Sequence, residues 1–254
     1  MFKAMKARWR QGFRTHPFPK EEPVLPHAFR GRPVIAGDRC PPDCTQCLTV
    51  CPTAAISRRD TGPTIDLGRC IFCTDCTRAC APGALRFSAD FRLACRTRSA
   101  LEISGEGRIP LAPLDPPLLR LLGRSLKLRQ VSAGGCNACE ADTNVLGTLT
   151  FDLGRFGIQF VASPRHADGL LITGPVTANM KLALEKTYAA VPSPKIVIAV
   201  GACAISGGLF SGYPEAGNGA PEVLPVDLFV PGCPPNPWTI LDGLLRLLNI
   251  GGQI

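Results

Sequence analysis

Eight of the thirteen cysteines in this sequence lie between residues 40 and 80. They form two runs with short gaps, Cys40-x3-Cys44-x2-Cys47-x3-Cys51 and Cys70-x2-Cys73-x2-Cys76-x3-Cys80. Three thiolates at such gaps can bind three corners of one cubic iron–sulfur core, while the fourth reaches the neighbouring core. The spacing predicts two [4Fe–4S] clusters. The expected ligands are Cys40, Cys44, Cys47 and Cys80 for one, and Cys70, Cys73, Cys76 and Cys51 for the other.

The same spacing is that of bacterial two-cluster ferredoxins. A zinc ribbon is the main alternative, but zinc takes its four ligands as two pairs and has no use for a third and a fourth cysteine in one run. Two details depart from the ferredoxin pattern. The first gap holds three residues instead of two, which leaves open whether Cys40 is a ligand, and Ala81 separates Cys80 from the proline that usually follows.

Four more cysteines each follow an apolar segment in the second half of the chain. Cys136 and Cys139 come after residues 126–132, Cys203 after residues 195–201, and Cys233 after residues 226–232. If these segments are parallel strands, their carboxyl ends meet at one edge of a sheet, where loops gather around a ligand. We therefore expect the four thiols to converge on a third [4Fe–4S] cluster.

Glycines stand beside these cysteines, at positions where the chain must turn tightly and backbone N–H groups can approach sulfur. They are Gly134, Gly135, Gly201 and Gly232. The plain alternative is that the four cysteines are small buried core residues, which does not explain why all four follow strands. Twelve cysteines suffice for three clusters, and we assign the remaining one, Cys95, to packing.

The elements that must position the cysteines differ between the two halves of the chain. Residues 33–40 resemble residues 63–70, and residues 51–56 resemble residues 80–85, which indicates an internal repeat. After residue 126, apolar strands alternate with helical segments, a pattern typical of a parallel sheet covered on both faces. We predict four parts: a basic amphipathic arm (1–33), a two-cluster ferredoxin-like domain (34–97), a linker (98–126) and an α/β domain (127–254).

Four stretches of the second half, GGCNACE, SPRHADGLLITGPVTANM, PKIVIAVGACAISGGLF and PVDLFVPGCPPNPWTILDGLLRLL, carry a family resemblance. They resemble the small subunit shared by energy-converting, membrane-bound [NiFe] hydrogenases of the formate-hydrogenlyase type and the 20 kDa subunit of complex I. Residues 30–95 resemble the two-cluster ferredoxin subunit of the same complexes. Because those subunits are normally separate chains, the resemblance implies a fusion.

The resemblance implies a flavodoxin-like α/β fold, with the downstream cluster facing the active site of a separate large subunit. Complex I subunits have adjacent cysteines where Cys136 and Cys139 are separated by two residues, which favours the hydrogenase branch. The resemblance also implies that Glu140 and Asp142, directly after Cys139, lie near this proximal cluster at the subunit interface and help to move protons. The alternative is an acid at a helix N-terminus that stabilises the helix dipole. Arg165 and His166 are expected to donate hydrogen bonds near the same cluster, or else to be ordinary loop residues.

The chain shows no phosphate loop, GxGxxG motif, Ser–His–Asp set or nickel site, so we expect electron transfer through three [4Fe–4S] clusters and an active site completed by a partner. The expected partners are a [NiFe]-hydrogenase-type large subunit, the membrane subunits of the complex and a donor such as a soluble ferredoxin or formate dehydrogenase. A complex-I-like oxidoreductase that reduces quinone or another acceptor, and a free polyferredoxin carrier, are the alternatives.

The net charge of +8 is unevenly placed, since residues 1–126 carry +9 and residues 127–254 carry −1. The basic half lacks the interleaved aromatic residues of nucleic-acid readers, so we expect no nucleic-acid partner. Residues 1–14 place Phe2, Met5, Trp9 and Phe13 at helical spacing among basic residues. This pattern fits a helix on a membrane or partner surface, or a frayed terminus. Since the first residues do not resemble an export signal, we expect a peripheral position on the cytoplasmic side of the inner membrane.

Overall fold

A five-stranded parallel sheet forms the centre of the second half of the chain in the computed structural model, which describes residues 2–59 and 62–251. Residues 1 and 252–254, which belong to the predicted arm and α/β domain, lie outside the described ranges. The order across the sheet is β10 (Leu228–Val230), β9 (Ile196–Val200), β8 (Gly169–Thr173), β6 (Leu126–Ser132) and β7 (Ile158–Phe160). The predicted α/β class with a parallel sheet is confirmed.

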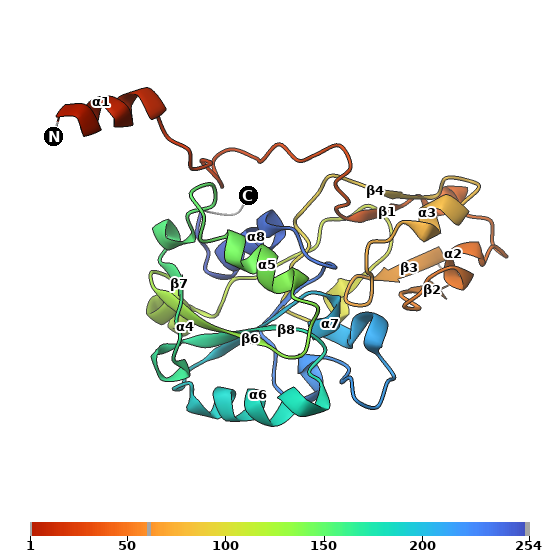
Figure 1. The fold of residues 1–254 in the computed structure, drawn as a ribbon. Coiled ribbons are helices and arrows are strands. Elements are labelled where there is room, and N and C mark those ends of the chain that lie inside the picture. The colour runs from red at the N-terminus through yellow and green to blue at the C-terminus, as the bar shows by residue number, and fades with distance from the viewer. Residues whose placement is uncertain (1, 60–61, 252–254) are drawn as a thin grey trace.

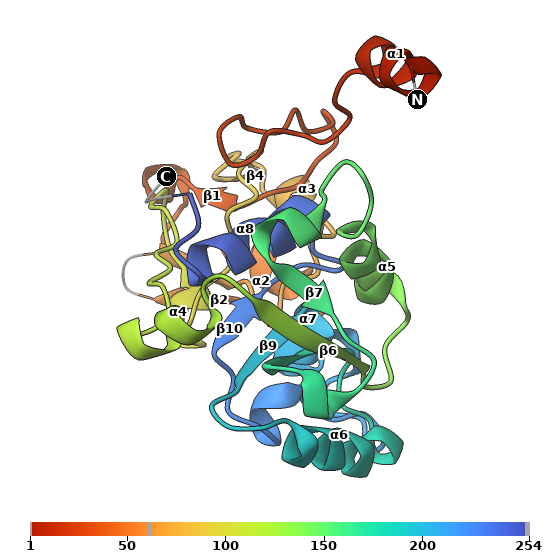
Figure 2. The same cartoon turned by 90° about the vertical axis from the view of Figure 1, so that its left-hand side faces the viewer.

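Helices cover both faces of this sheet (Figures 1 and 2). α5 (Ala138–Val145) and α8 (Pro237–Leu247) pack on one face, and α6 (Ala178–Ala190) covers the other. β8 and β9 are buried at every position, which is why their sequences are apolar throughout. α8 begins where the side chain of Asn236 accepts a hydrogen bond from the backbone N–H of Trp238, with Pro237 in the first turn.

The first half of the chain contains the two repeats as strand–helix–strand units. The first comprises β1 (Pro33–Ile35), α2 (Gln46–Thr49) and β2 (Ile56–Arg59), and the second comprises β3 (Gly62–Asp66), α3 (Asp75–Ala79) and β4 (Leu85–Phe87). β1 pairs with β4 and β2 pairs with β3, both antiparallel. Each antiparallel pair therefore contains one strand from each unit. The helix of each unit lies within its own cysteine run.

Residues 102–103 differ from the sequence expectation, which placed them in a linker. They form β5 (Glu102–Ile103), which extends the β2–β3 sheet by pairing antiparallel with β3. A two-residue strand is too short for an alternating pattern to appear in the sequence. The remainder of the segment includes α4 (Pro116–Leu122). The short 3-10 helices are Gly37–Arg39, Ser99–Leu101, Leu153–Phe156, Pro164–His166, Gly208–Phe210 and Ala220–Glu222.

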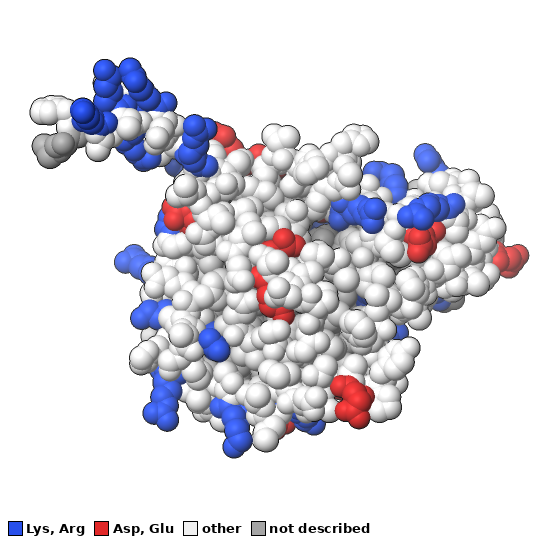
Figure 3. Space-filling view, in the orientation of Figure 1, with Lys and Arg blue, Asp and Glu red and all other residues white. Residues whose placement is uncertain are grey.

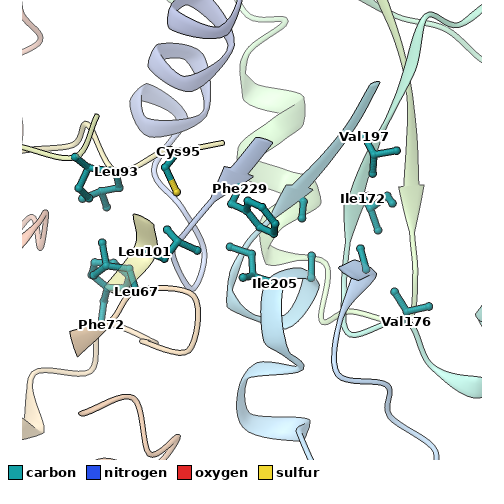
Figure 4. Packing of buried hydrophobic residues seen from close by; sticks show 14 of the residues in the cluster. Leu67, Phe72, Leu93, Cys95, Leu101, Ile172, Val176, Val197, Ile205 and Phe229 are labelled. Carbon is teal, nitrogen blue, oxygen red and sulfur yellow. The ribbon is translucent and has the colours of Figure 1, made fainter. Parts of the chain in front are cut away.

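One hydrophobic core joins the repeats to the α/β sheet. Cys95 and Phe229 exchange two backbone hydrogen bonds, of 3.0 and 2.8 Å, and both lie in this core with Leu67, Leu101 and Ile205 (Figure 4). Cys95 is fully buried, as expected of a packing cysteine. The cysteine runs and the sheet are therefore held in a fixed relationship by continuous packing.

The N-terminal helix α1 (Phe2–Gln11) projects from this body and buries none of its residues (Figure 1). After residue 200 the apolar segment continues as α7 (Ala202–Ser206) and a loop. Among the helices in residues 2–59 and 62–251, none combines the length and the apolar character needed to cross a bilayer.

Candidate metal centre

Three loops at the carboxyl edge of the parallel sheet bring the downstream cysteines together. Cys136 and Cys139 lie in the loop and first turn between β6 and α5, Cys203 lies in α7 after β9, and Cys233 follows β10. The loop after β9 is bonded directly to the loop after β10. Gly201 donates its backbone N–H to the carbonyl of Val230, and Ala202 donates to that of Gly232, both at 2.8 Å.

Close approach of neighbouring atoms makes glycine necessary at two positions in these loops, Gly201 and Gly174. A Cβ added at Gly201, whose φ is +92°, would lie 2.5 Å from the Sγ of Cys139. Gly135 and Gly174 meet in the same way, since a Cβ on Gly174 would lie 2.5 Å from the Gly135 nitrogen. The loop after β6 therefore contacts the loop after β8 through two glycines, and the loop after β9 through Gly201 and the side chain of Cys139.

The four downstream thiols lie close enough to affect one another's ionisation. Burial raises the pKa of the Cys139 thiol above its ordinary value, and negative charge on Cys203, Glu140, Cys233 and Cys136 raises it further. Burial, followed by Cys233 and Cys136, raises the pKa of Cys203 to about 11. Such thiols resist ionisation on their own, so they become thiolates when a positively charged core binds them.

The site is buried on one side and open on the other. Cys136 and Cys233 are exposed, whereas Cys139 and Cys203 are partly covered by the loops around them. A group bound by all four sulfurs would therefore sit at the surface of the chain, with one side available to another subunit.

Glu140 lies beneath the cysteine loops and is buried. Its Oε1 accepts hydrogen bonds from the hydroxyls of Ser132, at 2.6 Å, and Thr173, at 2.7 Å. These hydroxyls stand at the last positions of β6 and β8, so Glu140 ties two strand ends to the first turn of α5. The position suits both expected roles, a group beside the downstream site and an acid at a helix N-terminus.

The eight upstream cysteines fall into two groups within which the thiols affect one another's ionisation. Burial raises the pKa of Cys47, and Cys40, Cys44 and Cys80 add to the effect. Burial raises the pKa of Cys70 to about 12, with further contributions from Cys76, Cys51 and Cys73. The second set also lines one small cavity, of about 20 Å³. Cys80 of the second run lies near the first run, and Cys51 of the first run lies near the second. This crossing follows from the pairing of each repeat's strands with those of the other repeat.

Backbone N–H groups point at three of these sulfurs. Ala55 donates to Cys51 and Ala84 donates to Cys80, both at 3.2 Å, and Phe72 donates to Cys70 at 3.4 Å. Hydrogen bonds of this kind stabilise thiolates and lower the electron density on the iron that they bind. The donor set is thus thiol sulfur, grouped in fours and supported by N–H donors, which fits iron–sulfur clusters. Within the described residues, no three His, Cys, Asp or Glu side chains close around a single metal ion.

A cleft of about 330 Å³ is lined by one cysteine of the second upstream set, Cys73, and one of the downstream set, Cys233. Phe72, Arg30 and Asp142 also line it. Arg30 donates to the carbonyl of Phe72 at 2.9 Å, and burial raises the pKa of Asp142. Sequence reasoning expected Asp142 near the downstream site but missed Arg30, because only the fold brings residues 30, 73, 142 and 233 together.

The structure does not bring Arg165 and His166 to the cysteine site, where the resemblance led us to expect them. Their 3-10 helix precedes β8, so it lies at the amino edge of the sheet, opposite the cysteine loops. Both residues line a separate shallow cleft with Lys127 and Pro194. In a parallel sheet, residues that precede a strand lie at the amino edge, and residues that follow a strand lie at the opposite, carboxyl edge.

Fold and site together define an α/β subunit that presents four thiols at the carboxyl edge of its sheet. The chain belongs to the family described as the NADH ubiquinone oxidoreductase, 20 Kd subunit, whose model matches residues 136–247. That range contains all four downstream cysteines. The upstream cysteines lie outside it.

Individual relatives come from both branches of this family. Over 132 residues the chain is 44% identical to a probable membrane-bound hydrogenase subunit of Pyrococcus furiosus, covering 52% of this chain and 79% of that protein. It is 41% identical over 140 residues to formate hydrogenlyase subunit 7 of Escherichia coli, covering 55% of each chain. It is 47% identical over 113 residues to an NADH-quinone oxidoreductase subunit of Citrifermentans bemidjiense, covering 44% of this chain and 66% of that protein. The chain thus spans only about half of the formate hydrogenlyase subunit.

Proposed function

We propose that this chain is the electron-transfer subunit of a membrane-associated [NiFe] hydrogenase complex. Electrons pass through three [4Fe–4S] clusters to or from an active site in a separate large subunit. The observation that carries the proposal is the convergence of Cys136, Cys139, Cys203 and Cys233 from three strand-end loops of a 20 kDa-type subunit. Members of this family bind iron–sulfur clusters, and a cubane supplies one-electron chemistry when bound.

The two repeats are proposed to be a ferredoxin-like domain fused to the family domain. Their exchanged strands, paired cysteine sets and N–H···S contacts support this. Each thiolate of a [4Fe–4S] cluster binds a different iron atom. The four sulfurs therefore need not lie as close to one another as the ligands of a single metal ion. Iron–sulfur ligation by all twelve cysteines, Cys40 included, is part of the proposal.

The cleft between Cys73 and Cys233 supports an order for the relay. The set of Cys51, Cys70, Cys73 and Cys76, here called the inner set, borders the downstream site across this cleft. The set of Cys40, Cys44, Cys47 and Cys80, here called the outer set, lies beyond it and is coupled to it through Cys47 and Cys76. Electrons are proposed to move between the outer set and the large subunit by way of the inner and downstream sets.

Peripheral attachment to a membrane is proposed for α1. Its side chains Phe2, Met5 and Trp9 are 83%, 61% and 88% exposed, with Lys and Arg residues around them. Figure 3 shows these basic side chains gathered on the projecting helix. Apolar residues among basic ones suit an anionic lipid surface. The relatives named as membrane-bound hydrogenase and formate hydrogenlyase subunits support the same location.

A second candidate function has the same electron relay but a different catalytic large subunit. The match to the NADH-quinone oxidoreductase subunit favours a complex-I-like enzyme that reduces quinone or another acceptor. Purification of the chain with its partners separates the two. Nickel in the complex and hydrogen evolution with a reduced donor are expected for the hydrogenase, whereas quinone reduction without nickel would establish the alternative.

A further inference from the structure

The guanidinium of Arg58, on β2, spans the loop that holds the extra residue between Cys40 and Cys44. Its Nη1 donates to the Cys44 carbonyl at 2.9 Å and lies 3.6 Å from the Sγ of Cys40, within hydrogen-bonding range for sulfur. Its Nη2 donates to the carbonyl of Pro41 at 2.9 Å. One half-buried side chain therefore holds both ends of the lengthened loop and contacts one sulfur of the outer set.

The two repeats allow an internal comparison at this position. Ala55 and Ala84, 29 residues apart, donate the same 3.2 Å hydrogen bond to Cys51 and Cys80. The structure thus confirms the offset of 29 residues on this side of the repeats.

At that offset the counterpart of Arg58 is Phe87. Phe87 lines the cavity of the inner set together with Cys70 and Cys73, and its ring packs on that of Phe72 with centroids 5.9 Å apart. At this position the outer set therefore has a guanidinium that reaches a ligand sulfur, and the inner set has a phenyl ring. The guanidinium groups beside the inner loop, those of Arg30 and Arg78, donate to the carbonyls of Phe72 and Cys73 instead of to a sulfur.

We propose that Arg58 positions Cys40 as a ligand and makes the outer cluster easier to reduce than the inner one. Reduction adds one electron, and hence one negative charge, to the cluster without forming or breaking a bond. Arg remains protonated under all working conditions, so its charge stabilises the reduced cluster more than the oxidised one. A hydrogen bond to a ligand sulfur acts in the same direction. Phe87 supplies neither effect to the inner cluster, whose sulfurs accept hydrogen bonds from the neutral backbone N–H groups of Phe72 and Ala55.

The physical consequence is an order of reduction within the relay. An electron that enters the two upstream clusters resides preferentially on the outer one, whereas Cys73 of the inner set lines the cleft shared with Cys233. The inference rests on the proposed function, because it presupposes a cluster on each upstream set.

The test compares the full-length chain, purified without oxygen, with three variants at this position. Arg58→Gln removes the charge, Arg58→Phe reproduces the second repeat, and Arg58→Lys keeps the charge but loses the forked contact with the loop. Arg59→Gln is the matched control, because Arg59 carries the same charge one residue away and pairs with Glu102 at the surface. Iron is measured for each protein, and the midpoint potential of each cluster is measured by redox titration with electron paramagnetic resonance.

One cluster signal is expected to move to a lower midpoint potential in Arg58→Gln and Arg58→Phe, and by a smaller amount in Arg58→Lys. The signal of the other upstream cluster, and both signals of the Arg59→Gln control, are expected to stay at the wild-type values. A Cys44→Ser variant, which alters the ligands of the outer set, identifies the signal that belongs to it. Should Arg58→Gln or Arg58→Phe fail to assemble the outer cluster while Arg59→Gln retains it, the positioning role is supported, and Arg58→Lys then tests the potential.

Unchanged midpoints in charge-removing variants that retain full iron would overturn the inference, as would an equal shift in the Arg59→Gln control. So would a wild-type outer cluster that is reduced after the inner one. These results leave the proposed function intact. Failure of the proposed function has a different signature: wild-type protein in which the upstream cysteines hold well below about eight iron atoms, two cubanes' worth.

Discussion

The backbone of Gly201 passes so close to Cys139 that a Cβ at position 201 would lie 2.5 Å from the cysteine sulfur. The loop after β9 and the loop after β6 are thus in contact at the sulfur itself. This relationship, more than the spacing of the cysteines, makes the downstream residues one site.

Gly201→Ala is therefore expected to abolish or weaken the downstream cluster selectively. The added methyl must displace Cys139, and the φ of +92° is itself unfavourable for alanine. Iron is expected to fall by about four atoms per chain, one cubane. Gly212→Ala is the control, because Gly212 has a similar φ of +88° but nothing within 4 Å of its added Cβ. Equal iron loss in both variants would assign the effect to backbone strain.

Glu140→Ala is expected to destabilise the fold by about 1–3 kcal/mol, because it leaves the buried hydroxyl of Thr173, and the more exposed hydroxyl of Ser132, without their shared acceptor. Glu140→Gln retains an oxygen acceptor and is expected to be closer to the wild type. The apparent melting temperature of the iron-loaded protein measures the difference. A Glu140→Gln variant as unstable as Glu140→Ala would show that the charge, and not the acceptor, is required.

Stability between pH 5 and 7 is expected to depend on Asp242. Burial raises its pKa to about 6, against the lowering effects of Arg246 and Arg92, from an ordinary value of 3.8. The folded chain therefore binds more protons than the unfolded chain in this window, so the free energy of unfolding falls as the pH rises, by about 1 kcal/mol from this group. Asp242→Asn is expected to remove that contribution.

Thermal unfolding at pH 5, 6 and 7 tests this dependence. The wild-type melting temperature should fall relative to that of Asp242→Asn as the pH rises. Glu185→Gln, at an exposed position of α6, should follow the wild type. A constant difference between wild type and Asp242→Asn across the three pH values would contradict the prediction.

Vesicles containing anionic lipid are expected to bind the full-length chain through α1. Trp9 is 88% exposed, whereas Trp238 is buried, so a blue shift in tryptophan emission on binding reports Trp9. Replacing Lys3, Lys6, Arg8 and Arg10 by Gln should weaken binding by about 1 kcal/mol for each residue. Neutral vesicles and high salt should also weaken it. Undiminished binding to neutral vesicles would show that charge is not the cause.

The parallel sheet could be predicted because β8 and β9 are apolar throughout, and the placement of the downstream cysteines followed from the edge to which such strands point. The expected position of Arg165 and His166 was wrong because the resemblance does not say at which edge of the sheet a motif lies. Their segment precedes β8 and lies at its amino end, whereas Gly174 follows β8 and lies at the carboxyl edge with the cysteine loops. Arg58 was missed for another reason. Its contact with Cys40 depends on the pairing of repeats and on a side-chain path that no spacing reports.

An iron anomalous map of the purified chain, prepared without oxygen, shows whether the four downstream cysteines share one cluster. We expect one cubane bonded to the sulfurs of Cys136, Cys139, Cys203 and Cys233, with iron–sulfur density at the two upstream sets. A map in which these four sulfurs bind a single zinc ion, form disulfides or stand apart without iron would contradict the proposed relay.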